Sequence, residues 1–104
     1  MRYKSRRSKA TDITIEVRQE VLLRDNGICV FCKRQNGIPN AHYIPRSKGG
    51  LGIVQNVVSL CPECHYAFDF TTRHKEVGDV VKAHLEAHYP DFTDEQRIYK
   101  KGAL

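Results

Sequence analysis

The sequences C-V-F-C at residues 29–32 and C-P-E-C-H at residues 61–65 bound the segment that organises this chain, and they hold all four cysteines of its 104 residues. Two CxxC pairs can supply the four soft thiolate ligands of one tetrahedral zinc ion, at Zn–S distances of about 2.3 Å. Closing the loop between the pairs costs roughly 3 kcal/mol of chain entropy, whereas structural zinc contributes on the order of 10–16 kcal/mol. Cys29, Cys32, Cys61 and Cys64 are therefore expected to staple the domain through zinc. A redox pair, or iron in place of zinc, is the alternative.

The composition describes a small, basic chain with limited apolar material. Its hydrophobic fraction is 40%, its formal charge is +5, and its sequence pI is about 9.2. No apolar run is long enough for a transmembrane helix, and the charged start has no apolar signal-peptide region. We therefore expect one domain in a reducing cytosol, without membrane contact, where CxxC pairs are metal ligands rather than disulfides.

Hydrophobic spacing around the cysteines predicts an α+β domain. Residues 15–24 and 75–88 have helical periodicity, with threonines near 11–14 and 71–72 as candidate caps. Between them we expect an extended segment over 41–44 that ends at Pro45, a glycine loop over 47–52 and an apolar run over 57–60. A helix is expected to start at Cys64, and a capping-box pattern predicts a short helix from Thr93.

The loop between the cysteine pairs also carries A-H-Y-I-P at 41–45, Gly49-Gly50 and Asn56, and the second pair ends in Cys64-His65. This pattern resembles the zinc-ribbon form of the HNH endonuclease motif, and weaker similarity in the flanks extends it to about residues 12–101. The resemblance implies a ββα-metal (His-Me finger) core with a four-cysteine zinc site and flanking helices. It also implies metal-dependent attack of water on a DNA phosphodiester, leaving 5′-phosphate and 3′-hydroxyl ends.

The resemblance assigns a role to each polar residue of the motif. His42 is the expected general base, since an imidazole titrates near working pH. Asn56 is expected to hold the loop and orient the base, and His65 to bind a catalytic Mg²⁺ or Mn²⁺. Many family members have a second metal ligand just before the base, where this chain has Ala41, which cannot coordinate. Asp69, one helical turn after His65, is the expected replacement, and a structural role is the alternative for each residue.

DNA is the expected partner, and four basic side chains are candidate phosphate contacts. Arg46 and Lys48 lie beside the glycine loop, while Arg6 and Arg7 belong to a start of the chain that carries no acid in its first ten residues. A solubilising tail is the alternative for that start.

We expect a basic flexible arm over 1–10 and a single HNH nuclease domain over 11–104. The resemblance also points to the cytoplasm of a host cell of a phage or prophage, with phage packaging proteins as further partners. The competing interpretation, which Ala41 favours, is a non-catalytic zinc-ribbon module that binds nucleic acid. The pattern gives no oligomeric state.

Overall fold

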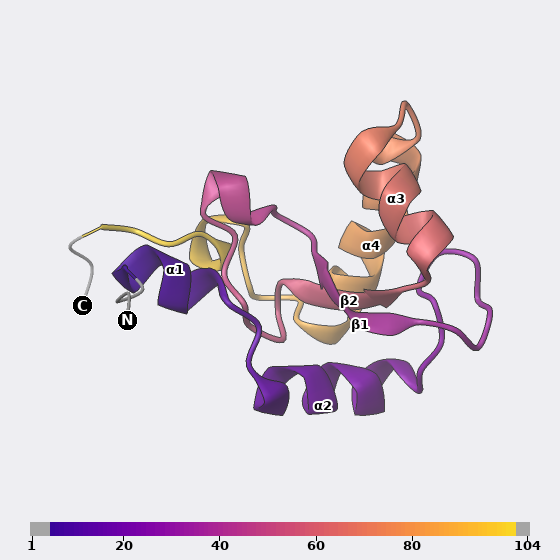
Figure 1. Cartoon of the computed structure of the whole chain (residues 1–104), viewed down its shortest axis with the longest axis horizontal. Helices are drawn as coiled ribbons and strands as arrows, with labels where there is room; N and C mark the ends of the chain where they lie inside the picture. Colours follow the sequence, from indigo (N-terminus) through magenta and orange to yellow (C-terminus); the bar gives the residue numbers. More distant parts are fainter. Residues whose placement is uncertain (1–4, 102–104) are drawn as a thin grey trace.

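A two-stranded antiparallel sheet lies at the centre of the fold, in a computed structural model that describes residues 5–101 (Figure 1). Strand β1 (Ile38–His42) pairs with strand β2 (Val57–Leu60), and Ala41 lies opposite Val58. Every residue of β2 is buried, because helices cover the sheet from more than one side.

The helices confirm the α+β class. Helix α2 (Ile15–Asp25) packs against both strands, and helix α3 (Pro62–Phe70) follows β2 directly and packs against helix α4 (His74–His88). Figure 1 shows α2 on one side of the hairpin, with α3 and α4 on the other. The remaining short elements are helix α1 (Arg6–Thr11) and the 3₁₀ turns η1 (Arg46–Lys48) and η2 (Glu95–Arg97).

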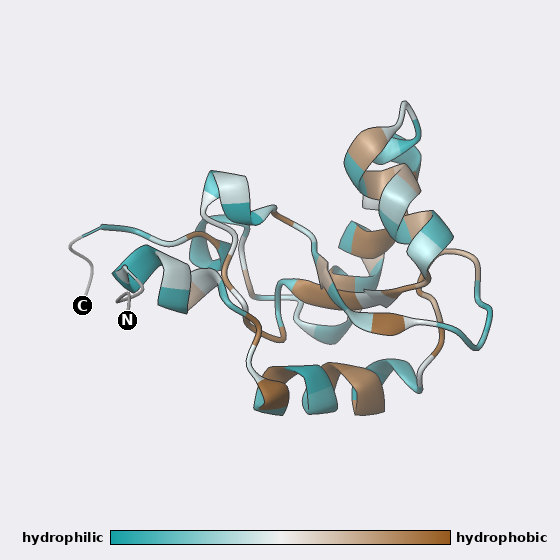
Figure 2. Cartoon of the chain, viewed as in Figure 1, coloured by the Kyte–Doolittle hydropathy of each residue, from teal (hydrophilic) through white to brown (hydrophobic). Residues whose placement is uncertain are grey.

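The core joins the cysteines to the apolar faces of the sheet and of helices α3 and α4. Figure 2 shows the hydrophobic residues concentrated in the sheet and the helices beside it, whereas α1 is largely hydrophilic. None of the helices within residues 5–101 combines the length and apolar character needed to cross a bilayer. The cluster of buried residues is Cys29, Val30, Ala41, Val58, Leu60, Cys61, Cys64, Ala67, Phe68, Val77, Val81 and Leu85.

The starts of the helices confirm some of the expected caps and correct others. The hydroxyl of Thr14 accepts from the Val17 N–H and caps α2, as its position predicts. Helix α3 starts at Pro62 rather than Cys64, since proline suits a first turn. Helix α4 has Arg73 as its N-cap without a side-chain bond, so a threonine cap from 71–72 was wrong; Thr71 Oγ1 instead accepts from the Arg73 N–H.

The hairpin also departs from the expected extended segment over 41–44. Strand β1 covers Ile38–His42, and beyond it only the Tyr43 N–H bonds to the backbone of Asn56, while the Ile44 N–H bonds to that residue's side chain. Within the glycine loop, Gly49 takes a left-handed φ of 83°. The reciprocal bonds between Thr93 and Gln96 confirm the capping box, although η2 is only a single 3₁₀ turn.

The start of the described chain includes helix α1, which the charge pattern did not predict. The guanidinium of Arg7 donates to the carbonyls of Arg46 and Ser47, at 3.1 and 3.0 Å. In the last turn of this helix, the Ala10 carbonyl accepts from the Gly52 N–H at 3.0 Å. A Cβ on residue 52 would lie 1.9 Å from the Asp12 carbonyl oxygen, so only glycine fits there. Residues 1–4 of the expected arm lie outside the described residues.

A buried carboxylate ties α2 to α4 and β2. Asp25 accepts from Arg24, from the Ser59 N–H at 2.9 Å and from His84 Nε2 at 2.8 Å. Burial raises the pKa of Asp25, but the hydrogen bonds from His84 and Arg24 outweigh it and hold that pKa well below its usual range. The charged carboxylate is therefore the form that links these elements.

Candidate metal centre and active-site cleft

The four cysteines converge on one point. Their Sγ atoms all lie within 4.8 Å of one another, and the Cys32 and Cys61 sulfurs are 3.7 Å apart. A tetrahedral ion with Zn–S distances of about 2.3 Å requires sulfurs about 3.8 Å apart. A disulfide would need about 2.05 Å, and all four thiols are free. The cluster therefore fits a zinc ion and not a pair of disulfides.

Each cysteine pair forms a tight knuckle around the sulfurs. The Cys32 N–H points at Cys29 Sγ at 3.5 Å, and the Cys64 N–H points at Cys61 Sγ at 3.4 Å. In the first knuckle Lys33 takes a left-handed φ of 67°, which turns the chain back after Cys32. Four protein ligands fill a tetrahedron and leave no open position, so a zinc ion held here would be structural rather than catalytic.

A cleft of about 440 Å³ lies between the end of β1, the η1 turn and helix α3. It collects three of the residues that the motif singled out, namely His42, His65 and Asp69. The polar candidates thus share one solvent-accessible space, although His42 lies on β1 and the other two on α3. Its lining residues are His42, Tyr43, Pro45, Arg46, Ser47, His65, Phe68, Asp69, Phe70 and His74.

The ring of His42, at the end of β1, is half-buried and held in one tautomer. Its Nε2 lies 2.8 Å from the Thr11 carbonyl oxygen. Because a carbonyl only accepts, Nε2 must carry the hydrogen, and Nδ1 of the neutral ring keeps its lone pair. Burial lowers the pKa of His42 below 6.5, against the opposing effect of the Thr11 bond. A neutral imidazole with a free Nδ1 is the form that can accept a proton.

Helix α3 places two candidate ligands side by side. His65 Nε2 and Asp69 Oδ2 are 3.1 Å apart, one helical turn from each other, and both side chains are partly exposed. Adjacent ligands of an octahedral Mg²⁺, at about 2.1 Å from the ion, are about 3.0 Å apart. This imidazole and carboxylate can therefore occupy two neighbouring positions of such an ion. Ala41, which precedes His42 in the chain, is fully buried in the core and contributes no ligand atom.

The side chain of Asn56 is fully buried behind the cleft. Its Oδ1 accepts from the Ile44 N–H at 2.9 Å, and its Nδ2 donates to the Ile44 and Leu51 carbonyls at 3.1 and 2.9 Å. These three bonds join the segment after β1 to the glycine loop. Asn56 does not line the cleft, so it can act only by holding the segment that follows His42.

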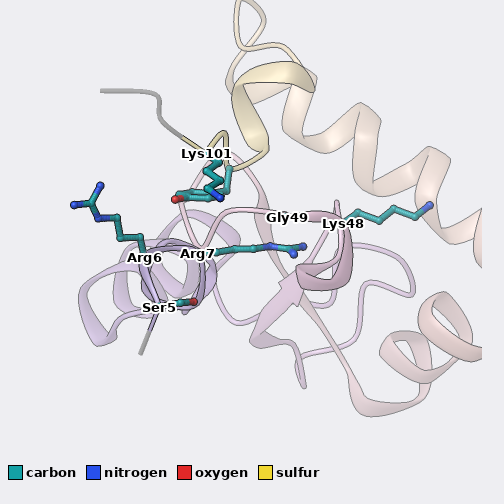
Figure 3. A pocket seen from close by; sticks show the side chains of 7 residues that line it. Ser5, Arg6, Arg7, Lys48, Gly49 and Lys101 are labelled. Carbon is teal, nitrogen blue, oxygen red and sulfur yellow. The ribbon is translucent and has the colours of Figure 1, made fainter. Parts of the chain in front are cut away.

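The candidate phosphate contacts spread over a broad face rather than converging. Arg46 lines the cleft and pairs with Asp12. Arg6, Arg7 and Lys48 line a second pocket of about 680 Å³, formed with the segment that carries Lys101. Figure 3 shows Arg6 and Lys48 extending away from each other on either side of that pocket, while Arg7 reaches toward the loop of Gly49. Such divergent charges suit an extended polyanion more than a single small anion.

Two residues of the cleft region carry no signal that marks them in the sequence. Thr11 contributes a backbone carbonyl, which any residue type could supply. His74 lines the cleft, and its Nδ1 donates to the Phe68 carbonyl at 2.7 Å while its ring stacks on that phenylalanine. Only the fold brings these groups to His42 and His65.

No family model matches the chain. The chain is 30% identical over 78 residues to the Type IV methyl-directed restriction enzyme EcoKMcrA of Escherichia coli (strain K12). This match covers 66% of the chain and 28% of that enzyme. The chain is also 45% identical over 38 residues to Anaredoxin of Nostoc sp. (strain PCC 7120), covering 36% and 50% respectively. The chain thus spans half or less of each relative. The similarity to a restriction enzyme, with the four-cysteine cluster, fits a zinc-binding, HNH-like protein.

Proposed function

We propose that this chain is a metal-dependent endonuclease of the HNH type, with a structural zinc and a ββα-metal core formed by β1, β2 and α3. The observation that carries the proposal is that His42, His65 and Asp69 line one cleft, from the strand and the helix on which that core would place them. The similarity to a protein named as a restriction enzyme supports a reaction on DNA. The proposed nuclease domain covers residues 11–104, with 1–10 as a basic extension.

The residues that the motif singles out each have a part in the proposed hydrolysis. The free Nδ1 of His42 takes a proton from the attacking water, and the Thr11 carbonyl keeps its ring in the required tautomer. His65 and Asp69 would hold a Mg²⁺ or Mn²⁺, and such an ion would stabilise the charge that develops on the phosphate and the leaving oxygen. Asn56 fixes the segment after His42 and so positions the base.

The basic face supports DNA as the substrate. Arg46 lies in the cleft, and Arg6, Arg7 and Lys48 extend the positive surface beyond it. Contacts of this kind bind phosphates without reading the base sequence. The proposal therefore includes backbone binding with little base selectivity. Its setting in the cytoplasm of a host cell of a phage or prophage, beside packaging proteins, rests on the motif resemblance alone.

A second candidate function is a zinc-ribbon module that binds nucleic acid without cutting it. Ala41 favours it, because it cannot coordinate a catalytic ion at the position just before the base, where many family members have a second metal ligand. A hard cation nevertheless commonly keeps several waters and takes phosphate oxygens as ligands. The pair formed by His65 and Asp69 is therefore sufficient for the nuclease proposal.

Plasmid cleavage separates the two candidates. Supercoiled DNA should be nicked or cut by the zinc-loaded protein when Mg²⁺ or Mn²⁺ is added. His42→Ala should reduce the rate by about 10²–10⁴-fold while leaving zinc content and melting temperature unchanged. The matched control is His88→Ala, on the outer end of α4, which should cleave normally. Equal DNA binding by the wild type and His42→Ala, with no cleavage by either, would instead establish the non-catalytic nucleic-acid-binding module.

A further inference from the structure

Helix α3 exposes an aromatic pair beside the candidate metal ligands. Tyr66 and Phe70 are 61% and 72% exposed, and their ring centroids lie 5.2 Å apart at a tilt of 45°. Each follows a candidate ligand directly in sequence, His65 and Asp69 respectively. A domain with limited apolar material thus leaves two large rings in water next to its proposed chemistry, which is unusual unless a ligand covers them.

The pair lines a groove that continues the cleft. His65, Asp69 and Phe70 line both spaces, and the groove extends from them past Tyr66 to Ile38 at the start of β1. A DNA strand with its phosphate in the cleft would therefore place a neighbouring nucleotide over the rings. Helix α2 also exposes large apolar side chains, but they are aliphatic and line neither the cleft nor the groove. They are Ile15, Leu22 and Leu23.

We propose, on the basis of the proposed nuclease function, that Tyr66 and Phe70 bind an unstacked nucleobase next to the scissile phosphate. In an intact duplex both faces of every base are covered by its neighbours, so exposed rings gain a partner only where the stack is broken. Base–aromatic stacking is sequence-tolerant, which agrees with a face that offers backbone contacts. The preferred substrate is thus DNA with unpaired nucleotides at the cut, either single-stranded or locally melted.

The charge of the chain favours this occupant over a second copy of the protein. Two chains of formal charge +5 repel each other, whereas a nucleic acid strand is attracted to the basic face. The carboxylate of Asp69 at the edge of the groove would be neutralised by a bound cation. A nucleic acid strand bound in the cleft would therefore reach the rings of Tyr66 and Phe70, whereas a second copy of the chain would first have to overcome charge repulsion.

Tryptophan fluorescence tests the proposal directly, because the chain contains no tryptophan. Phe70→Trp and, as matched control, Leu23→Trp would each be made in the His42→Ala background, which suppresses cleavage, and titrated with oligonucleotides in the presence of Mg²⁺. We expect a single strand to quench the indole of the Phe70→Trp variant strongly and a blunt duplex to quench it much less, while the control changes with neither. Equal quenching by both DNA forms, or none, would overturn the proposal.

Binding by anisotropy supplies the second measurement. Phe70→Ala should weaken binding of the single strand about fivefold or more and leave duplex binding nearly unchanged, whereas Leu23→Ala should affect neither. A loss of self-association in Phe70→Ala, seen by sedimentation, would overturn the proposal in favour of a protein interface. Because these readouts need no cleavage, selective quenching without any nuclease activity retains the base site and rejects only the enzyme. Plasmid cleavage by a protein whose rings do not respond rejects only the base site.

Discussion

Helix α3 serves two regions that differ in burial and in the hardness of their ligands. Its N-cap Cys61 and its first-turn residue Cys64 are almost wholly buried among soft sulfur ligands and apolar side chains. His65, the next residue, and Asp69, one turn later, are partly exposed and offer nitrogen and oxygen atoms. The first set suits zinc and the second a hard cation such as Mg²⁺. One helix can hold both because its successive residues point in different directions.

This contrast indicates that stability and chemistry are separable in so small a domain. The cysteine cluster fixes where α3 begins, and the sheet fixes where β1 ends, so the cleft between them is set by groups outside it. Substitutions in the cluster should therefore affect folding, whereas substitutions in the cleft should affect only the reaction.

The largest effect is expected from Cys61→Ser. Serine is a good N-cap, so the variant keeps the cap of α3 and loses only a metal ligand. Structural zinc contributes on the order of 10–16 kcal/mol, as much as the whole stability of a small domain. The variant should therefore show no cooperative thermal transition by circular dichroism. The control is His65→Ala, adjacent to the cluster, which should melt like the parent. A wild-type melting temperature for Cys61→Ser would refute the claim that zinc bound by the cysteines stabilises the domain.

The pH dependence of cleavage should report the cleft alone. Burial, Arg46 and His65 lower the pKa of His42, while the Thr11 bond and Asp69 raise it, and the net shift is downward from 6.5. In the proposed reaction the base is neutral imidazole, so kcat/KM should rise with pH, change about tenfold per unit below that pKa, and level off above it. The midpoint should lie below 6.5 in a pH–rate profile. A midpoint above pH 7 would contradict this assignment of the base. A melting temperature with the same pH dependence as cleavage would contradict the separation of stability from chemistry.

Asn56 is fully buried and also anchors the segment after His42, so its substitution should affect both stability and the reaction. Asn56→Asp removes the two bonds that Nδ2 donates to the Ile44 and Leu51 carbonyls. Leaving buried carbonyls unpaired should cost about 1–3 kcal/mol or more, measured as a lower urea midpoint. Cleavage by the folded fraction should also slow, because the segment after His42 loses its anchor. The exposed Asn36→Asp is the control, and equal stability of the two variants would argue against the anchor.

The smallest effect is expected from the basic face. Lys48→Gln removes one candidate phosphate contact, so the slope of log K against log salt should decrease by about 0.9 for duplex DNA. Arg18→Gln, on the outer face of α2, should leave the slope unchanged. Fluorescence anisotropy at several salt concentrations measures both. Equal slopes in the two variants would remove this face from the DNA contact.

The elements that the sequence predicted well are those whose signal is local. The CxxC spacing requires only a tight turn, and the periodicity around Val21 predicts α2 because one helical face must be buried. The gathering of His42, His65 and Asp69 in one cleft also agrees with the motif, while their catalytic roles stay predictions.

The features that could not be predicted depend on contacts between distant segments. Asp25 has the pattern of an ordinary helix-end residue, and only the fold brings His84 to within 2.8 Å of it. Helix α1 has the pattern of a charged run, because the carbonyls that hold Arg7 lie some 40 residues away in the chain. Local patterns contain no information about such partners, which the packing of the whole domain selects.

The absence of a side chain at residue 52 has a consequence for acid–base chemistry. The close approach of Gly52 to the Asp12 carbonyl sets the spacing between the loop and the chain at 10–12. The carbonyl of Thr11, within that stretch, decides which nitrogen of His42 carries hydrogen. A single added methyl group, as in Gly52→Ala, should therefore leave the zinc clamp whole while letting the imidazole exchange its protonated nitrogen. Proton abstraction by Nδ1 in the proposed nuclease would then depend on the hydrogen held on Nε2 of the same ring, which takes no part in the reaction.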